Sequence, residues 1–74
     1  MRKWIYTASF GTLEIVELSA TQFEARYNGE PGNIYDSPSA AADDFFTHHT
    51  GCDLWDSSDF CISDSLSEWT LLNF

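Results

Sequence analysis

The chain has 74 residues, with 12 acidic side chains against three basic ones and a net charge of −9. This length predicts one domain with a thin core, and an apolar fraction of 43% is too high for a disordered chain. The charge argues against nucleic-acid binding, which needs a basic face, and against an anionic membrane surface.

The charges are unevenly distributed along the chain. All three bases lie within the first 26 residues, and nine carboxylates with no base follow Asn28. No apolar stretch is long enough to span a membrane, and residues 1–10 do not resemble a signal peptide. We therefore expect a cytoplasmic protein whose two cysteines are reduced thiols.

Apolar and polar residues alternate in several short segments, as they do in strands with one buried face. The clearest are residues 4–10, 13–18 and 23–27, and a brief fourth segment covers residues 33–36. Short turns separate consecutive segments. This pattern predicts an antiparallel meander of three to four strands.

Residues 37–51 form the clearest helical pattern in the chain. Ser37 fits the N-cap, Pro38 fits the first helical position, and a run of three alanines follows. Phe45 and Phe46 share one predicted face, and Gly51 is the expected stop. The fold class is therefore α+β, with the meander packed against one helix.

The last third of the chain is acidic and lacks a clear period, so we expect irregular structure there. Residues 69–72 fit either a terminal edge strand or a tail packed on the helix. An exposed strand edge could pair two copies into a homodimer.

The acidic half also supplies the candidate partner-binding residues. Carboxylates on the outer face of the helix and in the following loop could engage a basic protein, and tryptophan is a frequent interface anchor. The alternatives are a solvated surface that only keeps the protein soluble and, for the tryptophan, a side chain that covers the underside of the helix. The candidates are Asp43, Asp44, Asp53, Trp55, Asp56, Asp59 and Asp64.

Metal binding and catalysis have weaker support. His48, His49, Cys52 and Cys61 are soft zinc ligands, but their spacing matches no zinc-finger or ribbon pattern. The preferred explanation is a helix end with one histidine near its negative dipole end and two buried small thiols. No catalytic motif is present, so we expect a non-enzymatic protein without a cofactor.

Two short motifs carry a family resemblance. Tyr35 followed by Ser-Pro-Ser-Ala-Ala-Ala, together with Leu-Ser-Glu-Trp at residues 66–69, resembles a group of small, uncharacterised bacterial proteins. Residues 35–42 are also similar to restriction-adenine-methylase-associated (RAMA) domains. That resemblance implies a small sheet leading into a helix, and a reader of modified DNA.

These observations lead to one principal hypothesis and two alternatives. The principal hypothesis is an acidic protein-interaction module, for example a phosphate-mimicking inhibitor from a phage or mobile element, that binds a basic protein surface. The alternatives are a RAMA-like reader of DNA, which the charge opposes, and a small zinc-binding protein.

Overall fold

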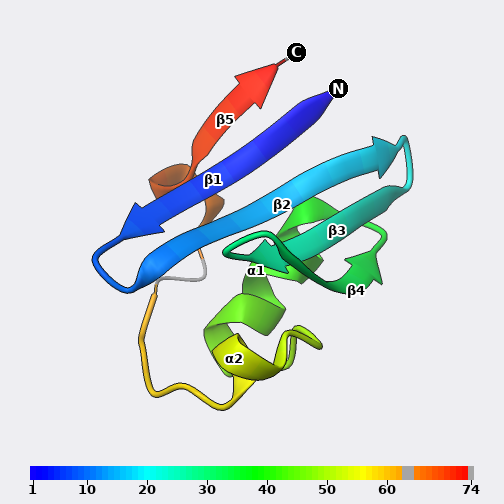
Figure 1. Ribbon diagram of the computed structural model, residues 1–74. Helices are drawn as coiled ribbons and strands as arrows, with labels where there is room; N and C mark the ends of the chain where they lie inside the picture. Colours follow the sequence, from blue (N-terminus) through cyan, green and yellow to red (C-terminus); the bar gives the residue numbers. More distant parts are fainter. Residues whose placement is uncertain (63–64, 74) are drawn as a thin grey trace.

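The computed structural model describes residues 1–62 and 65–73. It has an α+β fold in which a five-stranded antiparallel sheet carries a helical layer on one face (Figure 1). The strands lie in the order β4-β3-β2-β1-β5. Their bounds are Arg2–Ala8 (β1), Gly11–Ser19 (β2), Gln22–Tyr27 (β3), Glu30–Tyr35 (β4) and Thr70–Asn73 (β5).

The strand register aligns the apolar positions of the central strands on the helix-facing side of the sheet. Trp4 lies opposite Ile15, which in turn lies opposite Ala25, and Leu13 lies opposite Tyr27. All five side chains are buried. Since residues directly opposite each other share a face, the predicted alternation translates directly into one continuous core surface.

The sheet has one strand more than the expected upper limit of four. Strand β5 pairs with β1, so that Leu71 lies opposite Trp4 and Leu72 opposite Lys3. Of the two interpretations of residues 69–72, the terminal edge strand is therefore confirmed. Its partner is the first strand, about 70 residues away in sequence, and local alternation carries no information on such a pairing.

Helix α1 spans Pro38–Thr47 and begins as expected, because the Ser37 hydroxyl accepts a hydrogen bond from the Ala40 amide. Its end differs from the prediction. His48 adopts the left-handed conformation with φ of 61°. The backbone amide of His48 donates to the backbone carbonyl oxygen of Phe45, and that of His49 donates to the backbone carbonyl oxygen of Asp44. This is a Schellman termination, and it ends the helix before the expected stop at Gly51.

The C-terminal third contains more regular structure than expected. A one-turn helix, α2, spans Asp53–Asp56, and a 3-10 turn spans Leu66–Glu68 ahead of β5. Ser63, Asp64 and Phe74 lie outside the described residues, so the partner-binding role predicted for Asp64 has no structural counterpart here. None of the described helices is long and apolar enough to cross a membrane.

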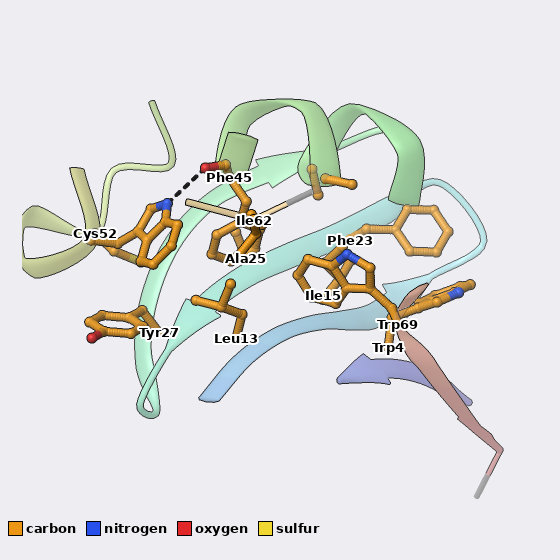
Figure 2. Packing of buried hydrophobic residues seen from close by; sticks show 13 residues of the cluster. Trp4, Leu13, Ile15, Phe23, Ala25, Tyr27, Phe45, Cys52, Ile62 and Trp69 are labelled. Carbon is orange, nitrogen blue, oxygen red and sulfur yellow. Dashed lines mark hydrogen bonds between the residues drawn. The ribbon is translucent and has the colours of Figure 1, made fainter. Parts of the chain in front are cut away.

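Trp55 of α2 is the largest fully buried side chain of the core. Its ring lies 5.4 Å from the ring of Tyr27 and 6.0 Å from that of Phe45. Its indole N–H donates to the Phe45 carbonyl oxygen at 2.9 Å, the contact drawn as a dashed line in Figure 2. Phe46, by contrast, is 52% exposed. The helical pattern had predicted that the two adjacent phenylalanines share the buried face. This prediction is wrong, because only Phe45 is buried.

Candidate functional site

The three basic side chains are neutralised within the N-terminal part of the sheet. Each forms an ion pair with a glutamate of β2 or β3, and these three glutamates are the only acids among residues 1–27. Three bases and three acids cancel, so the whole charge of −9 belongs to residues 28–74. The pairs are Arg2–Glu17 (2.9 Å), Lys3–Glu14 (2.9 Å) and Arg26–Glu24 (2.6 Å).

The Arg2 pair is the best-defined of the three. Its guanidinium and its backbone amide both donate to the Glu17 carboxylate. The side-chain hydrogen bond from Arg2 holds the pKa of Glu17 below its ordinary value. Arg2 is thereby occupied within the fold, and the same contact keeps Glu17 ionised.

The candidate carboxylates divide into exposed and engaged groups. Asp43 lies on α1, Asp53 begins α2, and Asp59 lies in the segment after α2. All three are exposed. Asp43 and Asp53 lie on the two helices that cover one face of the sheet (Figure 1). We count the segment after α2, which carries Asp59, as part of this helical layer, because the Phe60 carbonyl oxygen lies 2.8 Å from Nε2 of His48. We call these three residues the exposed aspartates.

Asp44 is engaged within the fold rather than free. It is half-buried, and its carboxylate accepts a 2.7 Å hydrogen bond from the Tyr35 hydroxyl. Burial and this contact with a carboxylate raise the pKa of Tyr35 well above its usual range. The Tyr35–Asp44 bond connects strand β4 to helix α1, so Asp44 has a structural role.

Asp56 closes the loop between the two helices. Its carboxylate accepts hydrogen bonds from the Thr50 amide (2.8 Å), the Thr50 hydroxyl (2.9 Å) and the Gly51 amide (2.8 Å). Thr50 is completely buried, and bonds to a charged acceptor are the stronger kind. These hydrogen bonds were not predicted from the sequence, because an acid that caps a preceding loop follows no recognised spacing.

Trp55 is a core residue and leaves no surface for an interface. Its exposed fraction is 0%, because α2 turns the indole toward the sheet and α1. The expectation that it anchors a partner is therefore corrected. Because Trp55 is buried and bonded to the Phe45 carbonyl oxygen, it holds the one-turn helix that carries Asp53 and Asp56 in place.

His48 fastens the end of α1 to the acidic segment. Its Nδ1 lies 2.9 Å from the Trp55 carbonyl oxygen and its Nε2 lies 2.8 Å from that of Phe60. Its ring stacks on Trp55 at 4.7 Å with an interplanar angle of 7°. Carbonyl oxygens only accept, so each of these two hydrogen bonds requires a proton on the ring nitrogen that donates it. The ring thereby connects the end of α1 to Trp55 and to the segment after α2.

The four candidate zinc ligands have separate surroundings. Both ring nitrogens of His48 face carbonyl oxygens, and His49 is exposed. Cys52 is fully buried and donates to the Glu30 carbonyl oxygen, whereas Cys61 is exposed. Within the part of the chain that the structure describes, no three His, Cys, Asp or Glu side chains group as a metal site would require, and no pocket opens.

Replacing His48 by asparagine tests the fastening contact. Asparagine tolerates the left-handed backbone but loses both hydrogen bonds and the stack, so we expect the free energy of unfolding to fall by about 2 kcal/mol. His49→Asn is the matched control, since His49 is exposed, and should change it by less than ~0.5 kcal/mol. Equal effects in urea denaturation would contradict the role of His48.

The two thiols should differ sharply in reactivity. Burial raises the pKa of Cys52, and the thiolate is the reactive form, so only Cys61 should react rapidly with Ellman's reagent in the native protein. The raised pKa also means that Cys52 stabilises the fold below the thiol's ordinary pKa and that this contribution is lost as pH rises. A fast phase that persists in Cys61→Ser would contradict this assignment.

Comparisons of the chain with family models, with curated proteins and with solved structures each returned no match.

Proposed function

We propose that this protein is a non-enzymatic acidic interaction module that binds a basic protein surface through the exposed aspartates of its helical layer. The observation that carries the proposal is the segregation of charge. The bases are cancelled by glutamates in the first 27 residues, and the helical layer belongs to the part of the chain that holds the entire net charge.

The fixed frame around these aspartates supports the proposal. Asp53 begins the helix that Trp55 anchors, and Asp43 lies on the helix that ends in the His48 contacts. Carboxylates on a rigid frame lose little conformational freedom when a partner binds, so more of the electrostatic attraction remains as affinity. A basic surface that normally meets nucleic-acid phosphates would be a suitable target, and a phosphate-mimicking inhibitor is one concrete form of the module.

Two triple variants of equal charge test the location of the binding surface. Asp43→Asn with Asp53→Asn and Asp59→Asn removes three charges from the helical layer. Glu14→Gln with Glu17→Gln and Glu24→Gln removes three from the sheet, and both variants have a net charge of −6 (−9 + 3). A lysine-rich peptide serves as the probe, and NMR titration of the full chain measures its binding at low salt.

We expect the helical-layer variant to bind the peptide roughly tenfold more weakly than the wild type, from three exposed charge pairs at ~0.5 kcal/mol each. The sheet variant should bind about as well as the wild type, and ~300 mM salt should weaken all three by shortening the Debye length. Equal loss in both variants would contradict the proposal. A gel shift with methylated or unmethylated duplex DNA would instead favour the RAMA-like alternative.

A further inference from the structure

The two edges of the sheet are protected differently. On the β4 side, Pro31 has no N–H to offer, and the Asn33 amide already donates to the Thr50 carbonyl oxygen at 2.6 Å. The Cys52 thiol donates to the Glu30 carbonyl oxygen on the same strand. Gly32 lies so close to the loop between α1 and α2 that a Cβ at this position would collide with the backbone oxygen of Thr50. Strand β4 is therefore closed to further strand pairing.

Strand β5 has none of these protections. All four residues of Thr70–Asn73 are exposed, and no segment among the described residues pairs with the outer side of the strand (Figure 1). The strand carries no charge and no proline, the features that usually block an edge. Leu71 and Leu72 are 47% and 42% exposed, and as neighbours in a strand they point to opposite faces of the sheet.

We propose that β5 pairs antiparallel with β5 of a second copy of this chain about a two-fold axis. Two molecules of charge −9 repel each other wherever their helical layers approach, but β5 brings no carboxylate into the contact. Glu68, the nearest described carboxylate along the chain, precedes the strand. An antiparallel pairing places the Glu68 residues of the two copies at opposite ends of the ladder, so these like charges do not face each other.

This pairing joins the two sheets into one and covers both leucines of each copy. The axis is perpendicular to the sheet, because opposite residues in an antiparallel pair point to the same side. A four-residue ladder buries less than the ~1,000 Å² that a stable interface needs. The dimer should therefore be weak and depend on protein concentration.

Sedimentation equilibrium of the full chain, from low micromolar to millimolar concentration, tests the proposal. We expect a reversible monomer–dimer equilibrium for the wild type. Leu72→Lys places like charges across the two-fold axis and should raise the dissociation constant at least ~10-fold. Ile34→Lys is the matched control, since Ile34 is 53% exposed on the closed β4 edge, and it should leave the equilibrium unchanged.

Amide hydrogen exchange gives a second readout that does not depend on the variants. Protection of the β5 amides should rise with protein concentration, whereas that of the β4 amides should not. A wild type that stays monomeric at millimolar concentration would overturn the proposal. A dimer that Ile34→Lys weakens as much as Leu72→Lys would also overturn it, because the contact would then lie outside the β5 edge.

Discussion

The burial of Trp55 is the constraint on which the helical layer depends. Its helix, α2, has only four residues, far below the length at which a helix is stable alone. The indole supplies the missing stability by filling the space between α1 and the sheet and by donating to the Phe45 carbonyl oxygen. His48 then stacks on the same ring and bonds the carbonyl oxygens of Trp55 and Phe60. One aromatic side chain thereby orders the acidic segment.

This arrangement divides the carboxylates by role. Asp44 and Asp56 accept hydrogen bonds inside the fold and hold α1, β4 and the interhelical loop together. The carboxylates of the exposed aspartates form no hydrogen bond or ion pair with the described part of the chain and face solvent. A dimer through β5 would place both helical layers on the same side of one sheet. Such a dimer would offer a partner two acidic surfaces, and linked sites bind more tightly than either alone.

Local patterns predicted the parts of the fold that local chemistry determines. The three long strands follow from alternation, and the start of α1 follows from Ser37 and Pro38. Two contacts escaped prediction. The pairing of β5 with β1 is distant in sequence, and the local contact of Asp56 with Thr50 follows no recognised spacing. The end of α1 was placed at Gly51 because glycine favours a left-handed residue, but the side-chain bonds of His48 stabilise that conformation earlier. Trp55 was named a partner-binding candidate because it lies in the acidic half of the chain, outside the alternation that predicted the core.

The most direct test of this division is the free energy of unfolding of two aspartate variants, measured by urea denaturation. In Asp56→Asn the amide NH₂ faces a backbone N–H that the carboxylate had bonded, so we expect a loss of about 2 kcal/mol. Asp59→Asn, at an exposed position, should change stability by less than ~0.5 kcal/mol. Equal effects from the two variants would contradict the division between structural and available carboxylates.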